Sequence, residues 1–153
     1  MKYCFDTSAL IEPWTRLYPP DVLRPVWEKL EDLIANGFVR APHEVLIELS
    51  NQLDDLHDWA LGNGAMFVPP DAPNVAKMKE IINAHPGLIK PNSTKSMGDP
   101  WVIALAEINR VPVVQYENKG KKGGAPKIPD VCGARGITCL TLIDVLRAEG
   151  FKL

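Results

Sequence analysis

Strand-like and helix-like segments alternate along the chain, and this alternation limits the possible folds more than any other feature. The strand-like segments are short and rich in β-branched residues, whereas the helix-like segments carry apolar residues at helical spacing. A repeated strand-then-helix order places the strands parallel in one sheet and the helices over its two faces. The sequence therefore predicts an α/β protein, a three-layer α/β/α sandwich with a central parallel sheet.

The predicted elements cover most of the 153 residues, which suits one domain spanning 1–153. Strands are predicted at residues 2–6, 38–41, 65–68, 111–115 and 137–140. Helices are predicted at 21–35, from Pro42 to about Trp59, at 73–84, at 100–109 and from Thr141 onward. A polar segment leads to Gly98, and residues 118–127 form a loop rich in Gly, Lys and Pro.

Composition narrows the environment and the classes of partner. The net charge of −2 gives no overall attraction to nucleic acid, so any such binding needs a local basic patch. Cys4, Cys132 and Cys139 form no CxxC pair and lie among apolar residues, which favours a reducing cytoplasm. The N-terminus lacks a signal-peptide pattern and no apolar run is long enough to span a bilayer, so no membrane association is expected.

Two carboxylates follow predicted strands. Asp6 ends the first strand, and Glu117 comes just after the strand VPVVQ. In an open parallel sheet, ligands bind beyond the carboxyl ends of the strands, where the loops form a crevice. Asp6 and Glu117 are therefore expected at one edge of the sheet, although each also fits an ordinary loop acid.

Two further acids lie next to apolar stripes of predicted helices. Glu48 stands beside the stripe of the helix from Pro42, where an acid needs a partner or a metal unless it is solvated on the helix flank. Glu44 lies four residues earlier on a neighbouring position and is an alternative to Glu48. Asp99 precedes Pro100, as expected of a helix N-cap, and it also heads the apolar stripe of that helix.

The motifs DTSALI, IEL, GDPWVIALA and VVQYE, in this order, resemble the PIN domain, a family of metal-dependent ribonucleases that includes VapC-type toxins. The resemblance covers essentially the whole chain, and KIPDVCGARGITCL near its end resembles one PIN-like branch of small prokaryotic proteins. It implies a PIN-like fold for the predicted sandwich.

The resemblance also implies roles for individual residues. Its four metal-binding and catalytic acids would be Asp6, Glu48, Asp99 and Glu117. Ser8 would orient Asp6 by a hydrogen bond, and Asp130 would be an accessory acid. Gln115 stands where the family often has Thr, and the fourth acid is the least regular part of the family pattern, so either Glu117 or Asp130 could complete the site.

The activity implied is that of a Mg²⁺- or Mn²⁺-dependent endoribonuclease that cleaves single-stranded RNA and leaves 5′-phosphate and 3′-hydroxyl ends. Such ions prefer oxygen ligands and activate phosphodiesters for hydrolysis, which explains the need for several carboxylates. Lys119, Lys121, Lys122 and Lys127 would bind RNA phosphates unless their loop is simply solvated. The small size and the resemblance imply the toxin of a type II toxin-antitoxin system, with a cognate antitoxin and often a homodimer.

Two alternatives come from other functional classes. The chain could be a catalytically weak PIN fold that binds RNA or another protein. It could also be a phosphatase with Asp6 as the nucleophile, although Ser8 stands where the DxDxT pattern of such phosphatases has its second Asp. No HExxH, GxSxG or P-loop pattern is present, so zinc-protease, serine-hydrolase and P-loop nucleotide hydrolysis have no support.

Overall fold

The central sheet has five parallel strands, as the alternation of elements predicted. The computed structural model describes residues 1–89 and 98–153. The strand order across the sheet is β3-β2-β1-β4-β5. The strands are β1 (Tyr3–Phe5), β2 (Val39–Pro42), β3 (Phe67–Val68), β4 (Val113–Val114) and β5 (Cys139–Leu140). β1 is therefore the central strand and pairs with β2 on one side and β4 on the other.

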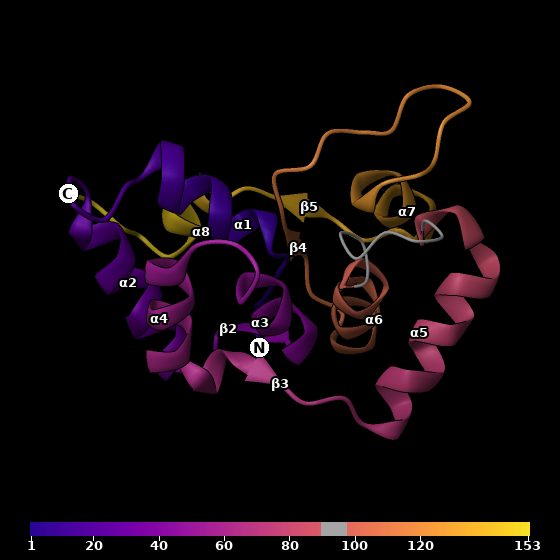
Figure 1. Cartoon of the computed structure of the whole chain (residues 1–153), viewed down its shortest axis with the longest axis horizontal. Coiled ribbons are helices and arrows are strands. Elements are labelled where there is room, and N and C mark those ends of the chain that lie inside the picture. Colours follow the sequence, from indigo (N-terminus) through magenta and orange to yellow (C-terminus); the bar gives the residue numbers. More distant parts are fainter. Residues whose placement is uncertain (90–97) are drawn as a thin grey trace.

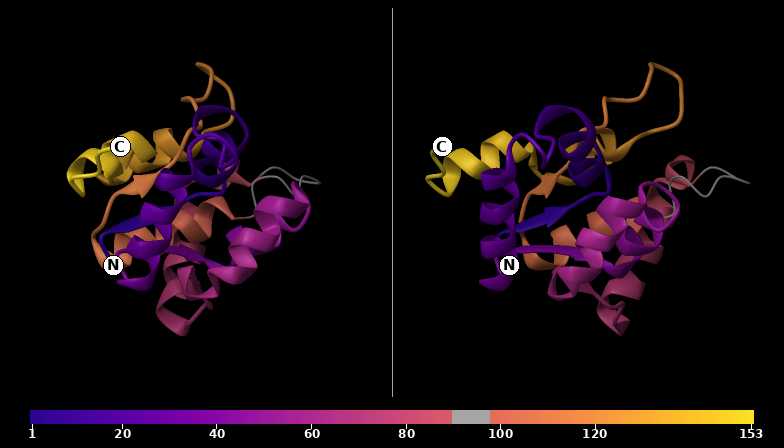
Figure 2. Two further views of the ribbon diagram at one scale, coloured as in Figure 1. Left: turned by 90° about the vertical axis from the view of Figure 1, so that its left-hand side faces the viewer. Right: turned by 60° about the vertical axis from the view of Figure 1, so that its left-hand side comes forward.

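Helices cover both faces of this sheet, which confirms the predicted three-layer arrangement. They are α1 (Ser8–Glu12), α2 (Arg24–Ala35), α3 (His43–Leu49), α4 (Asp54–Gly62), α5 (Ala72–Ala84), α6 (Asp99–Asn109), α7 (Ile128–Arg135) and α8 (Leu142–Ala148). Figures 1 and 2 show α1, α2, α4 and α8 on one side of the sheet and α5, α6 and α7 on the other. No helix in the described ranges is long and apolar enough to cross a membrane.

The winding of the chain reverses at β1. The connections from β1 to β2 and from β2 to β3 lead outward in one direction, whereas β4 and β5 lie on the opposite side of β1. Both faces of β1 and β4 are covered, and Cys4, Phe5, Val113 and Val114 are fully buried. This burial explains why the strand sequences are almost continuously apolar rather than alternating.

Three tryptophans pack together and join the turn at Pro13–Leu17, α2 and α4 on one side of the sheet. The Trp27 ring lies 4.7 Å from Trp14 and 5.0 Å from Trp59 between centroids, both in edge-to-face geometry. Trp27 Nε1 also donates to the Tyr18 carbonyl at 2.7 Å, so its polar atom is satisfied although the ring is buried. Aromatic packing of this kind contributes about 0.5–1.5 kcal/mol per pair beyond area burial.

The helix predicted from Pro42 to about Trp59 is wrong in one respect, because the structure divides it into α3 and α4. α3 ends at Leu49, the chain turns through Ser50–Leu53, and α4 begins at Asp54. Acidic residues at the start of α4 suit the positive end of the helix dipole and favour a new helix there. The break matters for the site, since it brings residues of the turn to the rim of the pocket described below.

Other differences concern segments with weak periodicity. α1 and a π-helical turn at Pro13–Leu17 follow the first strand, and α7 follows the loop at 118–127; none of these was predicted. Pro129 and Gly133 obscure the helical pattern of α7. Much of the polar segment predicted before Gly98, residues 90–97, lies outside the described residues.

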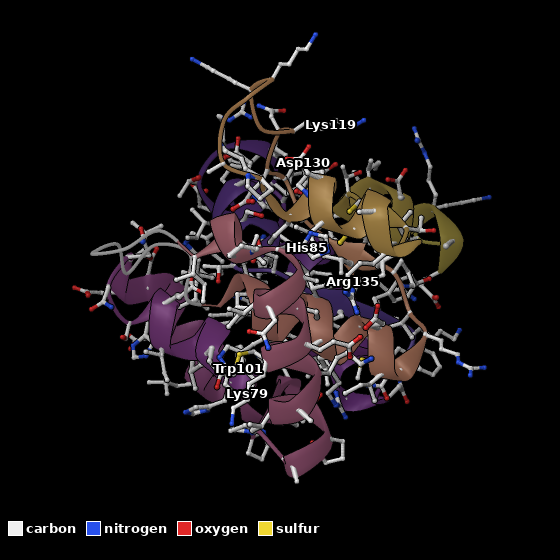
Figure 3. All side chains as sticks on the ribbon, turned by 90° about the vertical axis from the view of Figure 1, so that its right-hand side faces the viewer. Lys79, His85, Trp101, Lys119, Asp130 and Arg135 are labelled. Carbon is white, nitrogen blue, oxygen red and sulfur yellow. The ribbon has the colours of Figure 1, made fainter. Side chains whose placement is uncertain are left out.

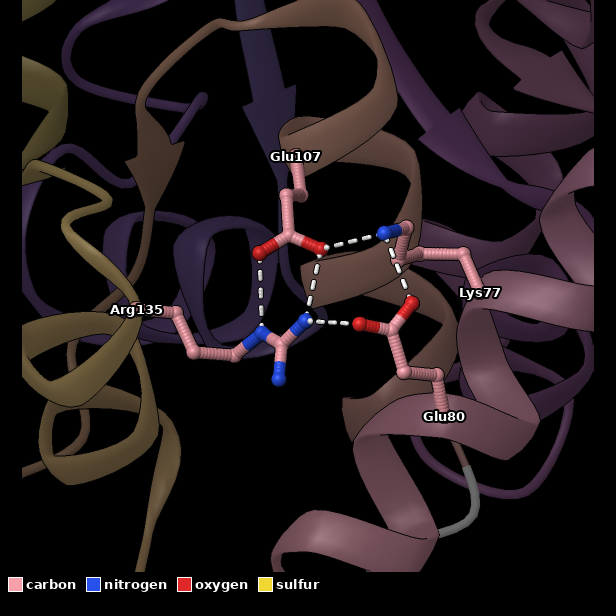
Figure 4. Close-up of polar contacts among 4 residues, drawn as sticks. All are labelled: Lys77, Glu80, Glu107 and Arg135. Carbon is pink, nitrogen blue, oxygen red and sulfur yellow. Dashed lines mark hydrogen bonds and ion pairs between the residues drawn. The ribbon is translucent and has the colours of Figure 1, made fainter.

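On the second helical layer, α5 lies against α6 with α7 beside them (Figure 3). An ion-pair network joins the three helices (Figure 4). Arg135 of α7 donates to both carboxylate oxygens of Glu107 at 2.8 and 2.9 Å and to Glu80 at 3.2 Å. Lys77 of α5 lies 2.7 Å from Glu80 and 3.3 Å from Glu107. The network therefore fastens α5 and α7 to α6, the helix that begins with Asp99.

Candidate functional site

A pocket of about 440 Å³ lies at the carboxyl ends of β1 and β4. These two strands are neighbours at the point where the winding reverses, and a crevice at such a point is the usual ligand site of an open parallel sheet. Residues from four parts of the chain line it: Asp6, Thr7, Ser8, Ile11, Glu12, Glu48, Asn51, Gln52, Asp99, Tyr116 and Glu117. All four acids expected in one site are among them.

Asp6 is fixed in place by Ser8, the contact that the resemblance to PIN domains implied. The Ser8 hydroxyl donates to Asp6 Oδ2 at 2.5 Å, and the Ser8 backbone N–H donates to the same oxygen at 3.1 Å. The Tyr116 backbone N–H in turn donates to Ser8 Oγ at 2.9 Å. Ser8 therefore ties the end of β1 to the segment after β4 and sets the direction of the Asp6 carboxylate.

Glu48 reaches the start of α6 because Gly98 has no side chain. A Cβ at Gly98 would lie 1.8 Å from Glu48 Oε1 and 3.0 Å from its Cδ. Glu48 Oε1 is buried and makes no hydrogen bond of good geometry within the described ranges, although the Thr7 side chain and the Gly98 backbone lower the pKa of Glu48 in part. A buried, unpartnered carboxylate oxygen aimed into a pocket is costly unless a proton or a cation satisfies it. Gly98 was not singled out from the sequence, although the motif GDPWVIALA contains it.

Asp99 is the first residue of α6 and not its N-cap. Gly98 occupies the N-cap position, and no side chain caps this helix. The prediction of a capping Asp99 was therefore wrong, whereas its predicted place at the head of the buried stripe is confirmed, since Asp99 is only 5% exposed. Freed from capping, the carboxylate lines the pocket.

Glu117 comes from the segment after β4 and is held weakly by the start of α7. The Ile128 backbone N–H donates to Glu117 Oε2 at 3.4 Å. Lys127, the residue before α7, adds a positive charge that lowers the pKa values of Asp99 and Glu117 in part. Of the loop lysines, Lys127 is thus the one that acts on the acids, which the sequence did not indicate.

Burial, together with the charge of Asp6 on the other three, raises the pKa values of the four acids and favours their protonated forms. Burial is the main cause that raises the pKa of Asp99 to about 9 and that of Glu48 to about 7, and the charge of Asp6 comes next in both. Burial also raises the pKa of Glu117, with Asp6 as the second cause, and burial raises that of Asp6 against the hydrogen bonds from Ser8. Carboxyl groups perturbed by burial and by one another are typical of functional sites.

Several predicted residues lie elsewhere. Glu44 does not line the acidic pocket; it lies with Trp101 and Asn74 in a small space of about 10 Å³ near β3, which favours Glu48 as the second acid. Asp130 also lies outside the pocket. It accepts hydrogen bonds from the N–H groups of Gly120 at 2.7 Å and Lys127 at 2.8 Å, so it shapes the loop and the start of α7 instead of completing the acid group.

The lysine-rich loop extends from the body of the protein beyond β4 (Figure 2). Lys119 lies near Asp130 at the base of the loop (Figure 3), and its charge helps to lower the pKa of that carboxyl after the backbone hydrogen bonds. Lys121 and Lys122 are exposed. The Lys119, Lys121 and Lys122 side chains are absent from the pocket lining, so contact with RNA at the acids would need the RNA to reach the loop as well.

The donor set suits a hard divalent cation, because it consists of carboxylate oxygens. Within the described ranges, however, no three His, Cys, Asp or Glu side chains already surround a single point as metal ligands. The fit to an ion therefore rests on the shared pocket, on the unpartnered Glu48 Oε1 and on the space left by Gly98.

Fold and pocket define an open parallel α/β domain with an acidic site at its topological switch point. Over residues 3–153 the chain matches the family described as Domain of unknown function (DUF4411), and it belongs to that family. Comparison with curated proteins gives no match.

Proposed function

We propose that this protein is a Mg²⁺- or Mn²⁺-dependent endoribonuclease of the PIN type, with Asp6, Glu48, Asp99 and Glu117 as the metal-binding acids. The observation that carries the proposal is that these four acids, remote in sequence, line one pocket, where burial raises their pKa values and the charge of Asp6 adds to the rise at Glu48, Asp99 and Glu117. A site that raises carboxyl pKa values in this way is relieved when a divalent cation replaces the protons.

The residues around the acids have separable roles in this proposal. Ser8 keeps Asp6 in one orientation, and Gly98 leaves room for Glu48. The bound ion supplies Lewis-acid activation of the phosphodiester and neutralises the charge that develops as the bond breaks. Lys127, whose charge acts on Asp99 and Glu117, would offer a positive charge to a neighbouring phosphate.

The narrower biological role rests on the resemblance to VapC-type toxins. In that role the protein is the toxin of a type II toxin-antitoxin system in the cytoplasm, with RNA as substrate, a cognate antitoxin that covers the acidic pocket, and a homodimeric state. Three free cysteines, Cys4, Cys132 and Cys139, fit a reducing compartment.

The test combines metal binding with cleavage. Calorimetry with Mn²⁺ should give carboxylate-dependent binding to the wild type that is lost in Asp6→Asn and in Asp99→Asn. Cleavage of a fluorophore-labelled single-stranded RNA should require Mg²⁺ or Mn²⁺ and fall by a factor of at least about 10² in both variants, the loss typical of removing one electrostatic contributor. Circular dichroism should find both variants folded.

Two controls separate the proposal from its alternatives. Glu44→Gln, outside the pocket on the same helix as Glu48, should keep both metal binding and cleavage. Full cleavage by Asp6→Asn and Asp99→Asn would refute the site, and metal-free RNA binding without cleavage would identify a binding module instead. Trapping of a phosphoryl group on Asp6 would favour the phosphatase.

A further inference from the structure

We infer that Tyr116 and Ile11 form a platform for one nucleobase of single-stranded RNA, next to the phosphodiester that would be hydrolysed at the acids. This inference rests on the proposed nuclease function and assigns it a base-binding residue.

The pocket is lined by two chemically different kinds of residue. Besides the carboxylates, Ile11 and Tyr116 line the pocket, and both are partly exposed and also pack against the core. A site for an ion and a phosphate needs only polar groups. An apolar lining with an aromatic ring suits a planar, uncharged group, and a nucleobase is the planar part of an RNA substrate.

Hydrogen bonds hold Tyr116 at its backbone and at its side-chain hydroxyl. Its backbone N–H donates to Ser8 Oγ at 2.9 Å, and its hydroxyl accepts from the Leu142 N–H at 3.0 Å, at the start of α8. The same Ser8 Oγ donates to Asp6. The Ser8 hydroxyl therefore fixes both the Tyr116 backbone and the Asp6 carboxylate. A base on the Tyr116 ring and a phosphate at the acids would then stay at a fixed distance from each other. A surface arranged before binding loses little entropy when the ligand docks.

Charge and size favour the same occupant. Five carboxylates line the pocket, so a phosphate is repelled unless a cation is present, whereas a neutral base is not. The volume of about 440 Å³ lies within the range of sites for small organic groups, roughly 300–1,000 Å³. Asn51 and Gln52, from the turn between α3 and α4, are exposed and bring amide donors and acceptors to the rim, where a base edge would lie.

The experiment measures RNA binding apart from cleavage. Eight-nucleotide single-stranded RNAs, intact or lacking the base at one position in turn, are titrated with the wild type in Ca²⁺ and followed by fluorescence anisotropy, and the RNA is checked for integrity afterwards. At one position, loss of the base should weaken binding by about 5- to 150-fold, which corresponds to the ~1–3 kcal/mol of one base–aromatic stack. If every abasic RNA binds like the intact one, the inference is overturned. This part of the experiment uses only the wild-type protein, so it does not depend on whether a variant folds.

Variants then identify the ring. Tyr116→Leu should weaken binding of intact RNA by the same factor and leave the RNA lacking the critical base unaffected, whereas Tyr116→Phe keeps the ring and should stay within about threefold of the wild type. Equal weakening of both RNAs by Tyr116→Leu would overturn the assignment to Tyr116. Base-dependent binding without any metal-dependent cleavage would refute the nuclease proposal but support the base platform. Metal-dependent cleavage with base-independent binding would support the nuclease proposal and refute the platform.

Discussion

Gly98→Ala should abolish most of the activity without destabilising the fold. Ordinary contact with a Cβ begins near 3.4 Å, whereas the added Cβ would lie 1.8 Å from Glu48 Oε1, so the carboxylate must move by about 1.6 Å. A displacement of about 1 Å at a reacting centre can cost roughly 10²-fold in rate. We therefore expect a loss of about 10²-fold in kcat/KM for RNA cleavage, equivalent to about 2.7 kcal/mol of transition-state stabilisation.

The fold itself should tolerate the change. Gly98 has φ −78° and ψ −25°, which suits alanine, and the atom it meets is the far end of a flexible side chain. Replacing Gly by Ala at a compatible position stabilises by about 0.4–1 kcal/mol through the unfolded state. Thermal unfolding should therefore show an unchanged or slightly higher midpoint.

Gly133→Ala is the matched control, because a Cβ at Gly133 in α7 meets nothing within 4 Å. It should keep full cleavage and Mn²⁺ binding. Glu48→Asp shortens the side chain, so its effect should be less than additive with that of Gly98→Ala. Activity and Mn²⁺ affinity of Gly98→Ala within threefold of the wild type would refute the reasoning, since the Glu48 carboxylate would then have no required place beside Gly98.

Three further outcomes follow from the electrostatics. Without metal, the free energy of unfolding should fall as pH rises from about 4 to 9. The pKa of Asp99 is raised to about 9 in the folded state, so the folded protein keeps a proton that the unfolded chain releases at lower pH. Asp99→Asn should remove at least about 1 kcal/mol of this fall, as measured by urea titrations at each pH. Arg135→Met should destabilise by about 1–2 kcal/mol, since it removes both Arg135 donors from Glu107 and leaves only Lys77 beside that carboxylate, and it should leave Mn²⁺ binding unchanged. Lys127→Met should weaken RNA binding and lower the salt slope by about 0.7, with a smaller effect for Lys122→Met at the exposed part of the loop.

The fold class and one contact of the candidate site could be predicted from the sequence. The fold class could be predicted because strands buried on both faces must be apolar throughout, and helices packed on one face repeat their apolar residues every three to four positions. The hydrogen bond from Ser8 to Asp6 could also be expected, because it joins residues two positions apart. Both are local properties of the chain.

Two predictions from the sequence were wrong: the single helix across Leu49, and Asp99 as the N-cap of α6. Apolar residues continue across the turn, so the periodicity gives no sign of a break, and Asp99 before Pro100 is a preferred capping pattern that the structure does not use. In both cases, tertiary packing overrides a local preference.

By itself, the sequence determined where the five strands lie, several of the helices and that acids follow two of the strands, since these features depend on the spacing of neighbouring residues. The tertiary structure alone decided that Glu48 and not Glu44 enters the pocket, that Asp130 shapes the loop, and that Gly98 makes room for Glu48. These outcomes depend on distances between residues far apart in the chain, which strand order and helix packing fix and which no local pattern encodes.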